Sequence, residues 1–450
     1  MDKTIKKEEM LLFNRSLEIG RISKDLYQTY SVKNGLRNED GTGVLVGLTK
    51  ISDVIGYHRD ENGNKIDDEG KLIYRGIDVK DIIDNAEFDE ACVFEEVCFL
   101  ILFGFLPNKE QFDSFRKILS KKYKLPNGFL EGEILRFPTA NLMNKMQQDV
   151  LTLYSYDKDP DDVSLEHIID QGLHLVAKMP SLMCFNYQSK IHHFDNKSMF
   201  IHHIDYSKSI AENILILTRY DREYTKKEAE VLDTALVLHA DHGGGNNSTF
   251  VNVVMSSTGT DIYSSFAGAI GSLKGPKHGG ANLKVADMMD EVIETIGYTH
   301  DKEVIRDLIN KILDKKFYDE SGLIYGMGHA VYTLSDPRSK ILKSKAKELA
   351  EEKGMTKQFE FYELFESIAK EELYKRKGIN VSSNVDFYSG FVYQMLNIPR
   401  DIYTLLFATA RSIGWLAHNI ENQLYSGKIV RPATKYVGEL HKYIKMGERE

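Results

Sequence analysis

The segment TKKEAEVLDTALVLHADHGGG, residues 225–245, decides the fold class of this chain. Thr225 and Glu228 have the spacing of a capping box, in which two side chains satisfy backbone groups at the start of a helix. Apolar residues then recur at helical spacing, and a triple glycine ends the pattern. The sequence therefore predicts an amphipathic helix with His239 and His242 in its last turn.

Helical spacing continues through most of the chain. The stretch FEEVCFLILFGFLP, residues 94–107, indicates a helix that is closed by a glycine and a proline. Alternating pieces that favour strands are short and early, namely GVLVGLTKI at 43–51 and KLIYRGIDV at 71–79. The predicted fold class is all-α, with a minor β element near residues 43–78.

The composition is that of an ordered globular protein. The 450 residues are 42% hydrophobic and 28% charged with nine prolines, and this length predicts about two or three domains, or a large domain with a smaller inserted one. The net charge is −9, and the basic residues are interspersed with acidic ones, which argues against a nucleic-acid partner. Cys92, Cys98 and Cys184 lie in apolar runs and are expected to be buried, reduced thiols.

The sequence also predicts where the protein works. No segment approaches the roughly 18 continuous apolar residues of a membrane span. The first twenty residues mix acids with lysines and match neither a signal peptide nor a transit peptide. We therefore expect a cytoplasmic protein with no membrane partner.

Two histidines beside glycines are candidates for chemistry. His278, in GPKHGGAN at 275–282, comes just before a predicted helix, whose positive end disfavours an imidazolium. A neutral ring there can donate a hydrogen bond to a carbonyl oxygen that gains charge. His329, in YGMGHAVY at 325–332, has small neighbours that open the backbone to a ligand. A structural role is the alternative for both.

Two arginines are candidates for binding an anion. Arg338 follows Ser-Asp-Pro at a helix start, where the dipole favours acids, so it indicates either an external anion or plain solvent exposure. Arg411 lies on a helix with two apolar faces and has no acid within one turn. A buried guanidinium needs a partner, which is either a distant side chain or a ligand carboxylate. Arg431, before a proline, is by itself an ordinary loop arginine.

One carboxylate stands in an apolar setting. Asp386 lies in SSNVDFYSGFVYQML, residues 382–396, at the start of a predicted helix. Capping that helix is one interpretation. The other is a general base, because partial desolvation raises the pKa of a carboxyl group and makes it a better proton acceptor.

Seven ordered blocks give the chain a resemblance to the citrate synthase family, in particular to the bacterial group that includes 2-methylcitrate synthases. The blocks are LIYRGID at 72–78, FEEVCFLILFGFLP, LHADHGGGNNSTF at 238–250, GPKHGGAN, GMGHAVY followed by DPR, NVDFYSG, and ARSIGWLAHNIEN followed by RP. The resemblance implies three catalytic residues, His278, His329 and Asp386. It also implies the oxaloacetate ligands His242, Arg338, Arg411 and Arg431, the last reaching across a homodimer interface.

The resemblance implies an acyltransferase of the citrate (Si)-synthase type, acting in the tricarboxylic acid cycle. It would condense acetyl-CoA with oxaloacetate and hydrolyse citryl-CoA, with propionyl-CoA and 2-methylcitrate as the alternative. No cofactor is permanently bound and no metal is used; acetyl-CoA is a cosubstrate. Its CoA moiety would contact Gly326, Met327, Gly328 and Lys377, whereas Gln188 stands where relatives often carry an arginine for the CoA phosphates.

The resemblance further implies a large helical domain, residues 1–282 and 392–450, and a small domain, residues 283–391, that closes over the ligands. Two interpretations from other classes remain. A metal-dependent hydrolase or lyase is one, suggested by the cluster of His239, Asp241 and His242 and by the two histidine pairs of IHHFDNKSMFIHHID at 191–205. An inactive helical scaffold is the other.

Overall fold

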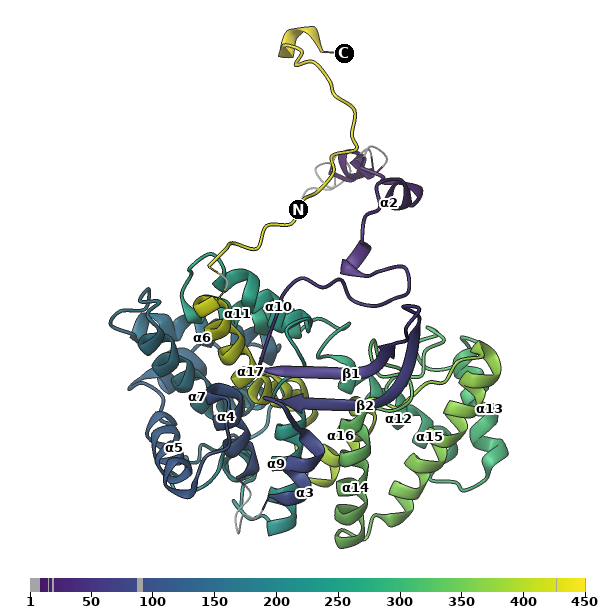
Figure 1. Cartoon of the computed structure of the whole chain (residues 1–450). Coiled ribbons are helices and arrows are strands. Elements are labelled where there is room, and N and C mark those ends of the chain that lie inside the picture. The colour runs from purple at the N-terminus through teal and green to yellow at the C-terminus, as the bar shows by residue number, and fades with distance from the viewer. Residues whose placement is uncertain (1–8, 15, 18–19, 87–91, 426, 450) are drawn as a thin grey trace. The chain divides into compact units, whose positions relative to one another are not determined.

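The computed structural model describes residues 9–14, 16–17, 20–86, 92–425 and 427–449. They form two compact units, one from residues 1–46 and 430–450 and the other from residues 47–429. The larger unit is a helical body with one small sheet, which confirms the predicted fold class (Figure 1).

Helices make up most of the larger unit. In chain order they are α3 (Val79–Asn85), α4 (Val93–Phe103), α5 (Lys109–Lys122), the π-helix η2 (Leu130–Leu135), α6 (Leu142–Leu153), η3 (Tyr154–Tyr156), α7 (Leu165–Phe194), α8 (Ile210–Thr218), α9 (Lys226–His239), α10 (Asn247–Ser256), α11 (Ile262–Leu273), α12 (Ala281–Ile296), α13 (Lys302–Leu313), α14 (Pro337–Glu352), α15 (Thr356–Lys377), α16 (Val385–Met395), η4 (Arg400–Ile402) and α17 (Tyr403–Tyr425).

The described residues of the smaller unit form short helical segments, which include residues 9–14 and 16–17. It contains α2 (Asp25–Thr29) and the 3-10 turns η1 (Asn34–Leu36) and η5 (Met446–Glu448). Its two chain segments meet where the Lys435 ammonium lies 5.6 Å from the centre of the Tyr30 ring.

The sheet has three antiparallel strands in the order β1, β2, β3. Strand β1 (Ser52–Arg59) pairs with β2 (Lys65–Tyr74), which pairs with β3 (Ile77–Asp78). The predicted β element is therefore present, but residues 43–51 form no strand. Leu48 in that piece is 93% exposed, so its side chain finds no apolar surface to pack against.

Helix α9 begins as its capping box predicts. The Thr225 side chain accepts a hydrogen bond from the Glu228 amide, and the Glu228 carboxylate accepts one from the Thr225 amide. The prediction for its end was wrong in part, because His239 is the last helical residue and His242 lies in the loop beyond. The Tyr74 hydroxyl causes the early end, since it lies 2.9 Å from the Val237 carbonyl oxygen and accepts from the Asp241 amide at 3.3 Å.

Glu228 is also the centre of a buried ion cluster, which gives a stability prediction. Arg219 donates to its carboxylate at 2.7 and 3.0 Å, and Lys353 donates to it as well. Burial raises the pKa of this carboxyl group, but the hydrogen bonds outweigh burial and lower it to about 2. Glu228→Gln is expected to lower the free energy of unfolding by about 2 kcal/mol, because it removes a buried anion that faces two partly buried cations. Urea denaturation measures this.

Glu230→Gln is the matched control on the same helix. The Glu230 carboxylate lies 4.0 Å from the Lys226 ammonium and 3.6 Å from that of Lys227, close to the surface. Such pairs contribute little, so the expected change is below about 0.5 kcal/mol. Equal losses in the two variants would contradict the stability prediction.

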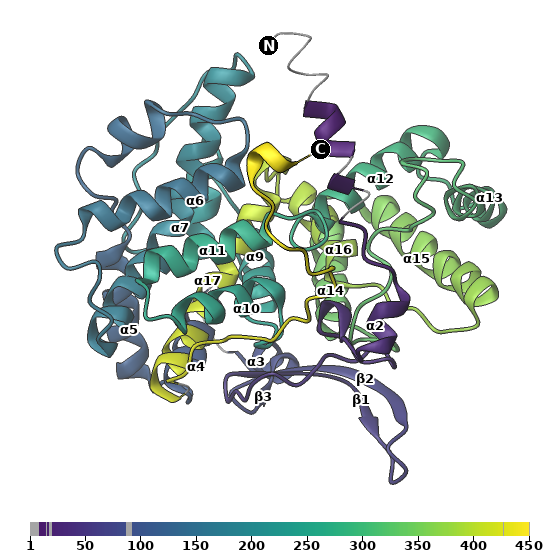
Figure 2. The same cartoon turned by 90° about the horizontal axis from the view of Figure 1, so that it is seen from above.

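Helix α17 runs through the middle of the larger unit. Its residues 403–419 are buried throughout, and Trp415 is fully enclosed. Figures 1 and 2 both show α5, α6 and α7 on one side of this unit and α12, α13 and α15 on the other. The assignment of residues 283–391 to a small closing domain remains a prediction. Helices α12, α13 and α15, which lie together, all belong to that segment or overlap it.

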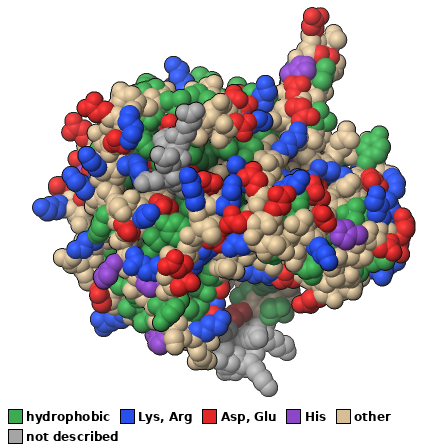
Figure 3. Space-filling model, turned by 90° about the horizontal axis from the view of Figure 1, so that it is seen from below, with side chains coloured by type: hydrophobic (Ala, Val, Ile, Leu, Met, Phe, Trp, Pro, Cys, Tyr) green, Lys and Arg blue, Asp and Glu red, His purple; other side chains and the backbone are tan. Residues whose placement is uncertain are grey.

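The surface and the cysteines agree with the composition. Figure 3 shows basic and acidic side chains interspersed over the face that it displays. Cys92, Cys98 and Cys184 are buried and take part in no disulfide within the described chain, as predicted. Among the described residues, every helix is too short or too polar to cross a membrane.

Candidate active site

Arg411 is the most deeply buried cation of the site. Its side chain is 0% exposed, and its Nε donates to the His239 carbonyl oxygen at 2.7 Å. Among the described residues, Nη1 and Nη2 have no hydrogen-bond partner. Burial lowers the Arg411 pKa to about 10, partly opposed by the charge of Asp241, so the guanidinium stays protonated near neutral pH. A buried cation with two unused NH2 groups is suited to a carboxylate ligand.

Arg338 is buried too, but its partner differs from the one that the sequence suggested. Asp336 is the N-cap of α14, and its two carboxylate oxygens accept from Arg338 Nε at 3.0 Å and Nη2 at 2.8 Å. The sequence predicts an external anion or solvent around Arg338, whereas the observed partner is Asp336. The helix start does hold its favoured acid, and the arginine folds back onto that acid.

His242 lies in the loop between α9 and α10, close to His329. The two ring centres are 5.1 Å apart, and the Tyr332 ring centre lies 5.7 Å from that of His242. The His242 Nε2 is buried and has no hydrogen-bond partner among the described residues. Burial and the Arg338 charge hold the His242 pKa well below its ordinary value, so the ring is neutral. Its free nitrogen is available to a ligand.

His329 is held by its own loop in one tautomer. Its Nδ1 accepts hydrogen bonds from the backbone amides of Val331 at 3.0 Å and Tyr332 at 3.1 Å. In the neutral ring the proton must then be on Nε2. The ring stacks on Tyr332 with 4.7 Å between centres, and the Arg338 guanidinium lies 5.7 Å from the same tyrosine.

His278 has the opposite tautomer. Its Nε2 lies 3.1 Å from Ser248 Oγ and accepts from the Ser248 amide at 3.4 Å, which leaves the ring proton on Nδ1. Ser248 is in the first turn of α10, so His278 faces the positive end of that helix as well as preceding α12. Burial and the Arg411 charge lower its pKa to about 4. The sequence argument missed Ser248, although it lies inside the quoted block at 238–250.

Asp386 is the second residue of α16, but it does not cap this helix. Asn384 is the N-cap, and its side chain accepts from the Asp386 amide at 3.0 Å. The Asp386 carboxyl group is partly buried, and desolvation together with the nearby Asp336 raises its pKa to about 6, against the opposing charge of Arg338. Such a group accepts a proton better than an ordinary aspartate does.

A cavity of about 250 Å³ adjoins His329. Its lining includes Met327, Gly328 and Lys377, three of the four residues predicted to contact CoA. The fourth, Gly326, accepts a hydrogen bond from the Asn384 amide at 2.9 Å, and the Gly328 amide donates to the Ser382 carbonyl oxygen at 2.7 Å. The glycine loop is thereby bonded to the segment that leads into α16.

Two further residues singled out by the resemblance are Arg431 and Gln188. Arg431 belongs to the smaller unit, where it is exposed, so its role stays a prediction. Gln188 is buried, and its side-chain oxygen accepts from the Phe200 amide at 3.1 Å. Lys190, two residues after Gln188 on α7, is paired with Asp195 at 2.8 Å and Asp401 at 3.0 Å.

Two of the residues that suggested a metal site, His239 and Asp241, have protein partners. His239 Nδ1 lies 2.7 Å from the Ala235 carbonyl oxygen, and the Asp241 carboxylate lies 3.1 Å from His418 Nε2. Within the part of the chain that the structure describes, no group of three or more His, Cys, Asp or Glu side chains could hold a metal ion.

The site thus combines two histidines whose backbone and hydroxyl contacts occupy opposite ring nitrogens, one carboxylate with a raised pKa and two buried arginines. Electrostatics connects them, because the Arg411 charge acts on His278 and His242, while the Arg338 charge acts on Asp386. Such a set can remove a proton beside a carbonyl group and donate to the oxygens that gain charge.

Comparisons with known proteins agree over nearly the whole chain. The family model "Citrate synthase, C-terminal domain" matches residues 39–433. A citrate synthase of Haloferax volcanii is 34% identical over 88% of this chain and 94% of its own length. The 2-methylcitrate synthase 1 of Corynebacterium glutamicum is 32% identical over 90% of this chain and 97% of its own length.

A solved structure is also similar. It is the ternary complex of citrate synthase from the thermophilic archaeon Thermoplasma acidophilum with carboxymethyl coenzyme A and oxaloacetate. The TM-score is 0.74 at 27% sequence identity, and the match covers 93% of this chain and 99% of the other.

Proposed function

The chain belongs to the citrate synthase family and is an acyltransferase of the citrate (Si)-synthase type, and on this premise we propose that its substrates are acetyl-CoA and oxaloacetate. The observation that carries the proposal is that the two Arg411 NH2 groups are buried without a hydrogen-bond partner in the described part of the chain. Together with the free His242 nitrogen, they suit a small dicarboxylate that also offers a ketone oxygen.

The proposed reaction begins with proton removal. The Asp386 carboxylate takes a proton from the methyl group of acetyl-CoA, while His278 Nδ1–H donates to the thioester oxygen as it gains charge. The resulting enol carbon attacks the ketone carbon of oxaloacetate and forms the new C–C bond. His329 Nε2–H donates to the ketone oxygen and protonates it. Water then cleaves the thioester of citryl-CoA, which gives citrate and the free CoA thiol.

The proposal assigns substrate binding to four side chains. Arg338, Arg411 and His242 bind the carboxylates and the ketone of oxaloacetate. Arg431 of a second copy of this chain also binds oxaloacetate, across the homodimer interface. The glycine loop at 326–328 and Lys377 bind CoA, and the cavity beside His329 supports this assignment. Closure of the segment 283–391 would exclude water until condensation is complete.

Release of the free CoA thiol tests the proposal directly. The protein is incubated with oxaloacetate and either acetyl-CoA or propionyl-CoA at equal concentrations, each with and without a chelator. We expect chelator-insensitive release that favours acetyl-CoA. A preference for propionyl-CoA would identify a 2-methylcitrate synthase instead. Both thioesters are tested because they differ by one methylene, which contributes only about 1–3 kcal/mol to discrimination. No release with either thioester would contradict the proposed function.

The raised pKa of Asp386 predicts the pH dependence of the reaction. The base acts as the carboxylate, and its pKa in the free protein is about 6. We expect kcat/KM to fall as the pH drops through about 6, by about tenfold per pH unit below that value. His278, with a pKa of about 4, stays neutral over this range and adds no limb. A profile that is flat from pH 7 to pH 5 would contradict the assignment of Asp386 as the base.

A further inference from the structure

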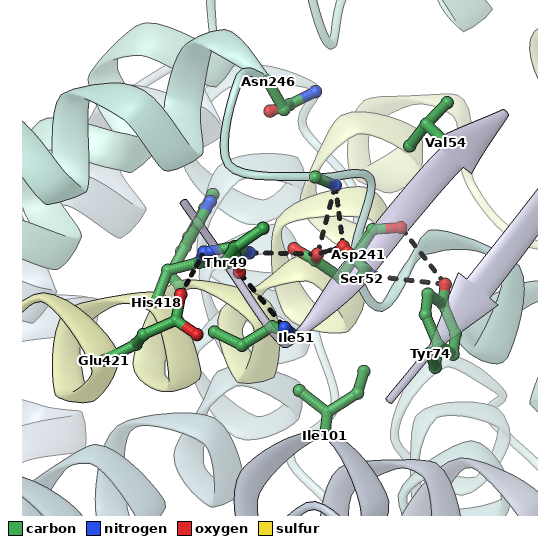
Figure 4. A network of polar contacts seen from close by, with 12 residues as sticks. Thr49, Ile51, Ser52, Val54, Tyr74, Ile101, Asp241, Asn246, His418 and Glu421 are labelled. Carbon is green, nitrogen blue, oxygen red and sulfur yellow. Dashed lines mark hydrogen bonds and ion pairs between the residues drawn. The ribbon is translucent and has the colours of Figure 1, made fainter. Parts of the chain in front are cut away.

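A buried polar network lies behind the oxaloacetate ligands proposed above. Asp241 is 0% exposed, and its Oδ2 lies 3.1 Å from His418 Nε2 and accepts a hydrogen bond from the Ser52 hydroxyl (Figure 4). Glu421 lies on the far side of the His418 ring, with its Oε2 3.9 Å from Nδ1. These residues come from β1, the α9–α10 loop and α17, which are distant in sequence.

The network holds the backbone on both sides of His242. Asp241 precedes this histidine and Gly243 follows it. The Gly243 amide donates to Ser52 Oγ at 3.0 Å and to Asp241 Oδ2 at 3.1 Å. On the other side, the Tyr74 hydroxyl accepts from the Asp241 amide. The backbone is therefore held by hydrogen bonds on both sides of His242, and the His242 ring faces His329 and Tyr332.

Helix α17 is fitted closely against the same carboxylate. Gly414 is a glycine for steric reasons, because a Cβ atom there would lie 2.4 Å from Asp241 Oδ1 and 2.6 Å from the Ala240 carbonyl oxygen. Arg411 is one helical turn earlier on α17. The position of Asp241 thereby sets the distance between the helix that carries Arg411 and the loop that carries His242.

The charge of Asp241 also acts on the arginine. Burial alone would raise the pKa of this carboxyl group, but the His418 contact, the Arg411 charge and the Ser52 hydrogen bond hold it well below its ordinary value. Asp241 therefore stays ionised. Its negative charge favours the protonated form of Arg411 in return, although the two side chains form no direct ion pair.

We propose that Asp241, Ser52 and His418 form a positioning network that keeps His242 and Arg411 set for oxaloacetate before the substrate arrives. The inference rests on the proposed function, because it assigns these residues to the same oxaloacetate site. They touch no substrate and act through the loop and through α17. Their loss should weaken oxaloacetate binding more than it alters the use of the CoA thioester.

Two variants separate the charge of the network from its hydrogen bonds. Asp241→Asn removes the charge with little change of shape, whereas Ser52→Ala keeps the charge and cuts the hydroxyl link to Gly243. For each variant, titration calorimetry gives the oxaloacetate Kd, and steady-state assays give kcat and the KM for acetyl-CoA. We expect the oxaloacetate Kd to rise about 10- to 100-fold in both variants, with the acetyl-CoA KM within about twofold.

Asp233→Asn is the matched control. Asp233 is as buried as Asp241, but it accepts the amides of Val93 and Phe94 at the start of α4. This variant should lose stability and keep the oxaloacetate Kd within about twofold. The inference is overturned if Ser52→Ala and Asp241→Asn bind oxaloacetate like the wild type, or if Asp233→Asn loses affinity equally. Absence of oxaloacetate binding in the wild type would instead overturn the proposed function, and the inference with it.

Discussion

Asp386→Asn is expected to lower kcat by about 1,000-fold while leaving the oxaloacetate Kd nearly unchanged. The amide has the size of the carboxylate, so the start of α16, which Asn384 caps, should stay intact. The variant loses the carboxylate that the proposed mechanism uses as its base, and the pKa of this carboxyl group is raised. The residual activity should also lack the limb near pH 6. Steady-state kinetics and calorimetry measure both quantities.

Asp301→Asn is a suitable control for this variant. Asp301 is the N-cap of α13, where it accepts the amides of Glu303 and Val304. Its replacement changes a carboxylate at a helix start without touching the site, so kcat should stay within about twofold. Near-normal turnover in Asp386→Asn would remove this residue from the mechanism.

Arg411→Lys is expected to raise the oxaloacetate Kd by about 100-fold or more. A lysine keeps the positive charge, but its single ammonium cannot bind the His239 carbonyl oxygen and also present two NH2 groups to a carboxylate. The free variant should be close to the wild type in stability, because in the wild type those NH2 groups have no protein partner among the described residues. Oxaloacetate should therefore raise the Tm of the wild type much more than that of the variant.

Arg400→Lys tests whether any arginine near α17 would behave in this way. Arg400 precedes this helix, and its partners Asp287 and Asp290 are about half exposed. We expect no change in oxaloacetate affinity. If Arg411→Lys binds oxaloacetate with wild-type affinity, the Arg411 guanidinium does not bind the oxaloacetate carboxylate and this assignment is wrong.

Features that depend on local spacing were predictable from the sequence. The capping box at Thr225 and Glu228 fixed the start of α9, since both partners of such a box lie within one turn. The closing glycine of α4 was equally local, because Gly104 takes a left-handed conformation with φ of 89°. The burial of Arg411 followed from the two apolar faces of its own helix.

Features that depend on partners distant in sequence were not predictable. The end of α9 is set by Tyr74, more than 160 residues away, so the position of His242 relative to the helix was wrong. Ser248 meets His278 only after two helices have packed together. The partner of Arg338 is Asp336, only two residues away. This ion pair forms because both side chains are buried, and the sequence spacing does not reveal that burial. Asp336 also lies close enough to Asp386 to raise the pKa of that carboxyl group.

The hydrogen bonds between the glycine loop and the start of α16 constrain how this enzyme can change. Met327 pairs with Ser383 across an isolated β-bridge, and Asn384 binds both Gly326 and Gly328. We therefore expect a substitution that alters this loop to disturb the start of α16 as well, where Asp386 lies. If Asp386 is the base, as proposed, a variant with an altered glycine loop is expected to recover its turnover only with a second, compensating substitution at the start of α16.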